Sequence, residues 1–166
     1  MIDEIYRKAK ISECGKYRYE LTRMWDLGSE QVICWVMLNP STADDKVDDP
    51  TIRRCMGFSR RLGFNHMQVV NLFGFRTTKP EELLDAPDPT RDNQVHLRCS
   101  VQASEMVVVA WGILSQRLAL MAQPSVAEIR STGVPLKCLG RTKAGYPRHP
   151  LYVKSYTPLD DFELNL

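Results

Sequence analysis

The sequence predicts an α/β fold: a three-layer α/β/α sandwich with a central, mainly parallel four-stranded sheet and an N-terminal edge strand or hairpin. Four apolar runs recur along the chain, at residues 31–38, 67–70, 106–110 and 135–140. Unbroken apolar runs are typical of strands buried on both faces, as in a parallel sheet covered by helices. Segments with helical signals separate the runs, and this alternation with short links favours the layered architecture.

A polar or aromatic residue follows each apolar run. These residues are Asn39, Asn71, Trp111 and, after the last run, His149. The carboxyl ends of parallel strands share one edge of the sheet, and ligands bind in the crevice outside that edge. We therefore expect the four side chains to line one pocket.

Length and composition fit one globular domain over residues 1–166. The hydrophobic content is 43%, the charged content 25% and the net charge +2, so nucleic-acid binding would depend on local basic clusters. No apolar stretch reaches the roughly 18 residues of a membrane span. The first residues also lack the apolar core of a signal peptide. We expect a cytoplasmic, monomeric protein that does not bind membranes.

Five cysteines are present, without a C-x-x-C pair. Cys34 and Cys138 lie inside apolar runs, which favours reduced thiols used as small core residues. The three histidines do not group with cysteines, so neither a metal nor another cofactor is expected.

The elements of the first half follow from alternation and capping signals. Residues 17–25 alternate in character and predict an antiparallel edge strand, which residues 26–29 turn into the first apolar run. Asp49 followed by Pro50 is typical of a helix start, and Gly63 marks its end about four turns later.

The second half alternates helices with the remaining strands. The predicted segments are a short helix at 77–84 with a Thr cap, a loop at 86–93, a helix at 92–103, a helix at 115–121, a loop at 123–125 and a helix at 126–131.

Asn39 opens the segment with the clearest chemical signal. Pro40 holds Asn39 extended and aims its amide out of the strand end, where it could position a water or bind a base edge. In the alternative interpretation, Asn39 and Ser41 only satisfy local backbone groups in a turn. The acidic residues that follow, including Asp44 and Asp45, are typical of a solvated loop with Asp49 as the helix cap.

His149 is the candidate acid or hydrogen-bond donor. Pro147 and Pro150 bracket it and stiffen the backbone around the imidazole. Basic residues that could contact phosphate surround it or lie on the helix after Asp49, although solvated arginines would give the same pattern. They are Arg53, Arg54, Arg141, Lys143 and Arg148.

Four short motifs, taken in order, resemble the uracil-DNA glycosylase superfamily. They are MLNP at 37–40, VVNLF at 69–73, VVVAWG at 107–112 and the His-Pro pair at 149–150. The first is similar to the family's Gly-x-Asp/Asn-Pro motif without the Gly, and the last to the start of its His-Pro-Ser motif. At finer grain, residues 39–44 and 49–55 look like a family of bacterial and phage proteins, domain of unknown function 1643.

The resemblance implies a monofunctional DNA glycosylase, which flips a base out of the DNA and leaves an abasic site. Asn39 would position the attacking water and His149 would stabilise the leaving base. The other implied roles are base binding by Asn71, Phe73, Trp111, Ser41 and Tyr146, and insertion into the duplex by Leu151 and Tyr152. Because Met37-Leu38 and Leu151-Tyr152 depart from the family's motifs, we expect a damaged or modified base other than plain uracil, such as a bulky phage base excised in phage defence.

Two other classes of function fit the same residues. One is a nucleotide or nucleoside hydrolase that uses Asp44, Asp45 or Asp49. The other is a module that binds nucleic acid or protein and catalyses nothing.

Overall fold

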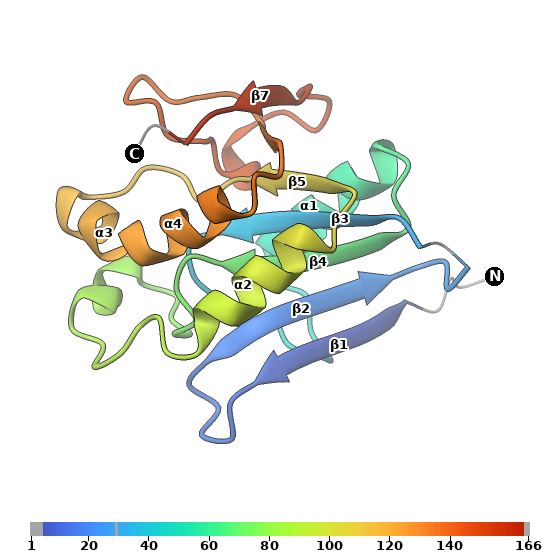
Figure 1. Cartoon of the computed structure of the whole chain (residues 1–166). Helices are drawn as coiled ribbons and strands as arrows, with labels where there is room; N and C mark the ends of the chain where they lie inside the picture. The colour runs from blue at the N-terminus through green and yellow to red at the C-terminus, as the bar shows by residue number, and fades with distance from the viewer. Residues whose placement is uncertain (1–4, 29, 165–166) are drawn as a thin grey trace.

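Seven strands form one mixed sheet in the computed structural model, which describes residues 5–28 and 30–164 (Figure 1). The strand order is β1-β2-β4-β3-β5-β6-β7. The strands are β1 (Tyr6–Ile11), β2 (Arg18–Met24), β3 (Val32–Met37), β4 (His66–Asn71), β5 (Met106–Val109), β6 (Leu136–Cys138) and β7 (Asp160–Phe162).

The four predicted apolar runs form the parallel centre of this sheet. Neighbouring strands pair in parallel from β4 through β3 and β5 to β6, which confirms the mainly parallel core. The remaining strands, β1, β2 and β7, pair antiparallel with their neighbours. The sheet is therefore larger than the predicted four strands.

The predicted edge strand at 17–25 is β2, and it is not at the edge. β2 pairs with β1 on one side and with β4 on the other, so β1 occupies the edge. β1 alternates exposed and half-buried residues and carries charged side chains, which is why its sequence gives a weak strand signal. The strand at 17–25 was therefore predicted correctly, whereas its edge position was wrong and the strand β1 was not predicted.

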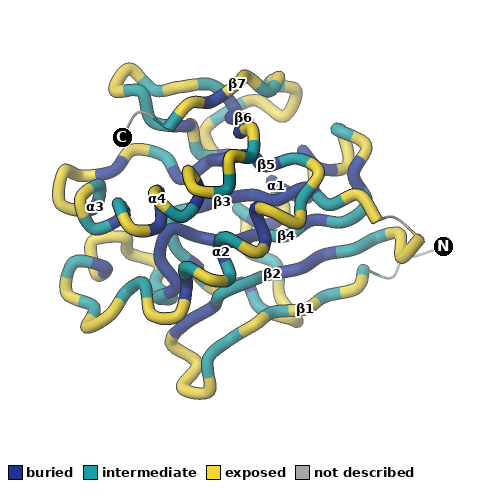
Figure 2. Tube along the Cα trace, in the orientation of Figure 1, coloured by how far each residue is buried: buried dark blue, intermediate teal, exposed yellow. Residues whose placement is uncertain are grey.

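Helices cover both faces of the sheet (Figure 1). They are α1 (Pro50–Arg61), α2 (Asn93–Gln102), α3 (Gln116–Met121) and α4 (Gln123–Ser131), with short 3-10 turns η1 (Pro80–Leu84) and η2 (Pro150–Tyr152). Alternate residues of β3 enter opposite cores: Trp35 packs on the α1 side and Val36 on the α2–α4 side. In Figure 2 the central strands are mostly coloured as buried, as expected for strands that are covered on both faces.

Two helix starts differ from the sequence prediction. Residues 123–125 are the first turn of α4, because proline is tolerated there, and only Ala122 separates α3 from α4. η1 begins after Lys79, and Thr77 is not its cap. α1 begins as predicted, since the Asp49 carboxylate accepts a hydrogen bond from the Ile52 N–H at 2.9 Å.

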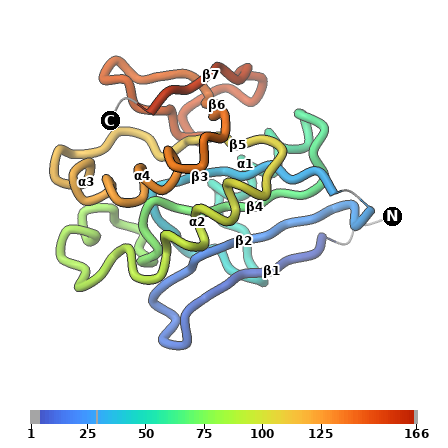
Figure 3. Tube along the Cα trace, viewed as in Figure 1, coloured from blue at the N-terminus to red at the C-terminus, as the bar shows by residue number. Residues whose placement is uncertain are grey.

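Residues 139–159 form a long connection between β6 and β7, and β7 then pairs with β6 as an antiparallel strand (Figure 3). This segment contains His149.

Of the five cysteines, all free, Cys34, Cys55 and Cys138 are buried, whereas Cys14 and Cys99 are exposed. No helix within residues 5–28 and 30–164 is long and apolar enough to cross a bilayer.

Candidate functional site

A pocket of about 850 Å³ opens at the carboxyl ends of the parallel strands. From β3 the chain first adds β4 on one side and then β5 on the other, so the topology reverses between β3 and β5. Open α/β sheets bind ligands at such a reversal, and this volume suits a small ligand. We call this cavity the switch-point pocket.

The switch-point pocket collects most of the residues predicted for the site. Those that line it are Asn39, Ser41, Asn71, Trp111, Lys143, Arg148, His149, Leu151 and Tyr152. Chain segments up to 113 residues apart in sequence (39 and 152) therefore meet at one sheet edge, as the positions after the apolar runs predict.

The two remaining predicted base-contacting rings do not line the pocket. Phe73 is fully buried among the side chains that pack against α2 and α4, and Tyr146 packs against the same cluster. Core packing therefore uses both rings.

Three of the predicted phosphate-contacting arginines also lie outside the pocket lining. The Arg141 guanidinium lies 4.4 Å from the ring centroid of Phe162 in β7. Arg53 donates to the backbone oxygen of Asp48 at 2.5 Å. Arg54 donates to the backbone oxygens of Pro150 (3.1 Å) and Val153, so it ties α1 to the turn after His149.

The Asn39 side chain has a fixed orientation. Its Nδ2 donates to the backbone oxygens of Pro40 at 3.0 Å and Thr77 at 2.7 Å. Because both partners are carbonyl oxygens, the NH₂ group must face them, and Oδ1 is left as an acceptor. The predicted local turn interaction therefore exists, and it leaves one atom of Asn39 available to a ligand or a water.

Asn71 is the most unusual polar group of the pocket. Its side chain ends β4, is 1% exposed, and has no hydrogen-bond partner at either Oδ1 or Nδ2. Leaving a buried polar group unpaired costs about 1–3 kcal/mol, so such groups are normally satisfied by protein, water or ligand. The Asn71 amide thus presents a donor and an acceptor side by side at the buried end of the pocket.

Two polar residues missed by the sequence analysis hold the end of β4. Asn93 Nδ2 donates to the backbone oxygen of Asn71 at 2.8 Å, and Ser125 Oγ donates to that of Leu72 at 2.5 Å. Both side chains are fully buried. They satisfy the carbonyls of the last residue of β4 and of the residue after it, and so fix the backbone that carries the Asn71 side chain.

Trp111 lies two residues after the end of β5, is 2% exposed, and has no hydrogen-bond partner at its Nε1–H. The ring packs edge-on against Phe162, with centroids 6.1 Å apart. Trp111 therefore offers the pocket a second buried donor.

His149 has a defined tautomer because Nδ1 accepts a hydrogen bond from the Leu151 N–H at 3.3 Å. In the neutral ring the proton then sits on Nε2, which becomes a donor. Burial lowers the pKa of His149, with the Asp49 carboxylate acting in the opposite direction, so the ring is neutral at neutral pH. Gly112 has φ 78° and lies so close that a Cβ there would be 3.6 Å from the His149 Cβ.

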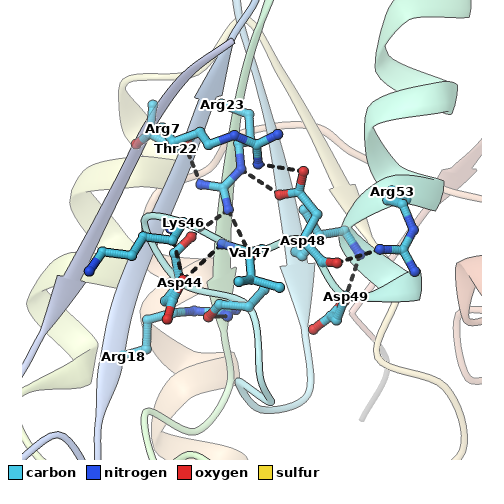
Figure 4. Close-up of polar contacts among 12 residues, drawn as sticks. Arg7, Arg18, Thr22, Arg23, Asp44, Lys46, Val47, Asp48, Asp49 and Arg53 are labelled. Atoms are coloured by element: carbon cyan, nitrogen blue, oxygen red, sulfur yellow. Dashed lines mark hydrogen bonds and ion pairs between the residues drawn. The ribbon is translucent and has the colours of Figure 1, made fainter.

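The acidic loop before α1 is an ordered structure around a buried arginine (Figure 4). Arg23 is fully buried and donates to Asp48 Oδ1 at 2.7 Å and to the Asp44 backbone oxygen at 2.5 Å. Asp49 caps α1 as predicted and Asp45 is exposed, but the prediction of a solvated loop is wrong for Asp48, whose side chain is 10% exposed. Asp44 and Asp45 do not line the pocket, whereas Asp49 does.

We expect the stability of the folded protein to fall in mild acid because two of its histidines are partly buried. Burial lowers the pKa of both His66 and His149 in the folded protein. Above the usual value of about 6.5 both states are neutral, and below it the unfolded chain takes up protons that the folded chain resists. Thermal unfolding should therefore show a lower Tm at about pH 5.5 than at about pH 7.5, with a smaller difference in a His66→Gln/His149→Gln variant. A Tm that rises on acidification would contradict this assignment.

No three His, Cys, Asp or Glu side chains of the described chain gather as a metal site would require. The fold and the pocket define an α/β protein with a pocket at the reversal point of its sheet. Residues 18–151 match the family described as protein of unknown function (DUF1643), and the chain belongs to this family. No curated protein and no solved structure matches it. The match includes every residue of the pocket lining except Tyr152.

Proposed function

We propose that this protein is a DNA glycosylase, which hydrolyses the N-glycosidic bond of a damaged or modified base and leaves an abasic site. The observation that carries the proposal is the buried, unpartnered Asn71 amide in the same pocket as Asn39 and His149. A donor and an acceptor side by side match the edge of a nucleobase. The resemblance to the uracil-DNA glycosylase superfamily assigns the same residues to this chemistry.

The proposed reaction needs the base outside the helix, because the glycosidic bond is unreachable within the base stack. The flipped base would enter the pocket with its edge against Asn71 and the Trp111 N–H. A pocket of about 850 Å³ has room for a nucleobase with a substituent. The pocket thus supports a modified base as substrate.

Asn39 and His149 would divide the chemical step between them. Asn39 Oδ1 accepts a hydrogen bond from a water and holds it for attack on the sugar C1′. The bond from C1′ to the base nitrogen breaks, the base keeps the electron pair, and His149 Nε2–H donates to the negative charge that develops there. The water's hydroxyl ends on C1′ and its other proton goes to the departing base or to solvent.

The mouth of the pocket suits a DNA backbone. Lys143 and Arg148 are exposed there, and they could contact the phosphates that flank the flipped nucleotide. Leu151 and Tyr152 are 42% and 82% exposed beside them, as side chains that enter a duplex must be.

The DNA-binding part of the proposal predicts a salt effect. Lys143→Ala and Arg148→Ala should each weaken binding to all DNA sequences and lower the salt slope of the affinity by about one unit. Fluorescence anisotropy with duplex and single-stranded oligonucleotides at several salt concentrations measures this. Arg130→Ala, an exposed α4 position outside the pocket, is the control and should keep the wild-type slope. Wild-type binding that does not depend on salt would contradict the prediction.

A glycosylase screen tests the chemistry. Oligonucleotides with varied bases, and DNA from phages with modified genomes, are incubated with the protein, and abasic sites are read as strand cleavage after alkali. Excision of at least one base is the expected result. Turnover of free nucleotides without excision would instead favour a nucleoside or nucleotide hydrolase, an alternative supported by Asp49, the acidic residue in the pocket lining. Binding without turnover of either substrate would favour a non-catalytic module.

A further inference from the structure

A buried arginine in the switch-point pocket has fewer partners than its charge requires. Arg18 begins β2, is 2% exposed and belongs to the pocket lining. Nη1 donates to the Ala43 backbone oxygen at 2.7 Å, whereas Nε has no partner. Within the described chain, Arg18 forms no ion pair. Buried charges in proteins are normally paired, so this arginine needs an explanation.

Asp49 and Asp44 act on Arg18 through their charge, but neither forms a hydrogen bond or an ion pair with it. Asp49 Oδ1 instead caps Ile52, and Asp44 Oδ1 accepts from two N–H groups of its own loop. Two further cations, Arg76 and Arg23, repel the positive charge of Arg18 and lower its pKa. Burial lowers the pKa of Arg18 to about 10, with Asp49 opposing, so the guanidinium is still protonated at neutral pH.

We propose that the buried end of the pocket binds an oxyanion of the ligand at Arg18, and that this oxyanion is an acidic substituent on the excised base. The identity of the base rests on the proposed function, whereas the anion site itself does not. Antiparallel pairing of β2 with β4 sets Arg18 beside the chain just after Asn71, where the Arg18 N–H donates to the Gly74 oxygen at 2.9 Å. Both residues also line the same pocket, so the Asn71 amide and the Arg18 guanidinium are available to one ligand there.

The burial of Arg18 indicates that its anion is not a phosphate of the DNA backbone. Lys143 and Arg148 are exposed at the mouth, where the backbone of a flipped nucleotide would remain, whereas Arg18 and Asn71 are almost fully buried. In base excision the part of the substrate that reaches the buried end is the base. The anion that Arg18 would bind is then carried by the base, and a carboxylate is the simplest group of this kind.

Calorimetric titration of the full chain tests the site with two probes of similar size, uracil-5-carboxylate and the neutral 5-hydroxymethyluracil. The acid should bind about tenfold or more tightly than the neutral compound, because a hydrogen bond to a charged group is a strong one. Arg18→Met should abolish this preference, while Arg130→Met, the same change on the exposed face of α4, should keep it. Equal affinities in wild type, or an undiminished preference in Arg18→Met, would overturn the proposal.

A second measurement does not depend on how well Arg18→Met folds. The Nε–H signal of Arg18 in the wild-type protein is assigned by its loss in Arg18→Lys, and it should shift when uracil-5-carboxylate is added. A signal that stays in place at a saturating concentration would overturn the proposal. Titration with inorganic phosphate and with deoxyuridine 5′-phosphate distinguishes the source of the anion: binding of these alone through Arg18 would show a phosphate site and reject the acidic base. Binding of the acid through Arg18 without excision of any base would reject the glycosylase proposal and leave the anion site standing.

Discussion

His149→Ala is expected to slow base excision by about a hundredfold or more while the protein stays folded and still binds DNA. The neutral ring is held by the Leu151 N–H at Nδ1, so Nε2–H is a preorganised donor. Such a donor stabilises charge that appears only as the glycosidic bond breaks. Its loss therefore lowers the rate of the chemical step more than it lowers the affinity for DNA.

Asn39→Ala should have a similar effect for a different reason. It removes the oxygen that would position the water, and it also removes the amide that donates to Pro40 and Thr77. Some loss of stability is therefore expected in addition to the lower rate. Asn39→Asp separates the two effects, because it keeps an acceptor oxygen but loses both hydrogen bonds.

Single-turnover excision on the best substrate of the screen, with thermal unfolding of the same variants, measures both quantities. His96→Ala is the control for His149→Ala, since His96 lies on α2 next to Glu20 and does not line the pocket. Its rate per folded molecule should equal that of wild type. Full excision activity in His149→Ala would remove the central residue of the mechanism and favour the binding-module interpretation.

The parallel core and the convergence of four side chains on one pocket follow from local sequence patterns. An apolar run must be buried on both faces, and the end of such a strand must open at the sheet edge, so Asn39, Asn71, Trp111 and His149 could be placed together without coordinates. Sequence patterns do not reveal which aromatic side chain turns away from the pocket. Phe73 lies two residues after Asn71, just beyond β4, and there it points into the core.

The residues that were missed are polar side chains whose burial depends on tertiary contacts. Arg18 and Arg23 lie in a strand that alternates in character, where arginine normally faces solvent. Their burial results from the loop between β3 and α1, which folds over them and supplies backbone acceptors from residues 43, 44 and 47. Asn93 gives no local signal either, because its partners are the carbonyls of Asn71 and Leu72, more than 20 residues away. The available clue was charge: two arginines on one strand and four aspartates on one loop are complementary partners.

Arg23→Met is expected to be strongly destabilising, at about 3–5 kcal/mol of unfolding free energy. Arg23 is fully buried and makes hydrogen bonds to Asp48, to Thr22 at 2.8 Å, to Asp44 and to Val47. Methionine fills similar space but leaves these acceptors without their donor. The Asp48 carboxylate, whose side chain is 10% exposed, would keep only Arg7 as a charged partner.

Thermal and urea unfolding measure the effect, and a chain of this size should lose on the order of 6–20 °C in Tm. Arg7→Met is the matched control: its side chain is 29% exposed, so the loss should be about 1 kcal/mol or less. The double variant Arg23→Met/Asp48→Leu should recover part of the stability, because it removes the buried charge together with its partner.

The pH dependence of the unfolding free energy tests whether the ion pair with Asp48 causes the effect of Arg23→Met. Burial would raise the pKa of Asp48, but the hydrogen bonds from Arg7 and Arg23 outweigh it and hold the pKa below its usual value. In wild type this contribution to stability is present above about pH 4 and is lost as the pH falls through the lower folded pKa. In Arg23→Met the carboxylate takes up its proton more readily, so the gap in unfolding free energy between the two proteins should narrow below about pH 4. A gap that stays constant with pH would mean that Arg23 stabilises the loop through its backbone hydrogen bonds and through packing, with no contribution from the charge of Asp48.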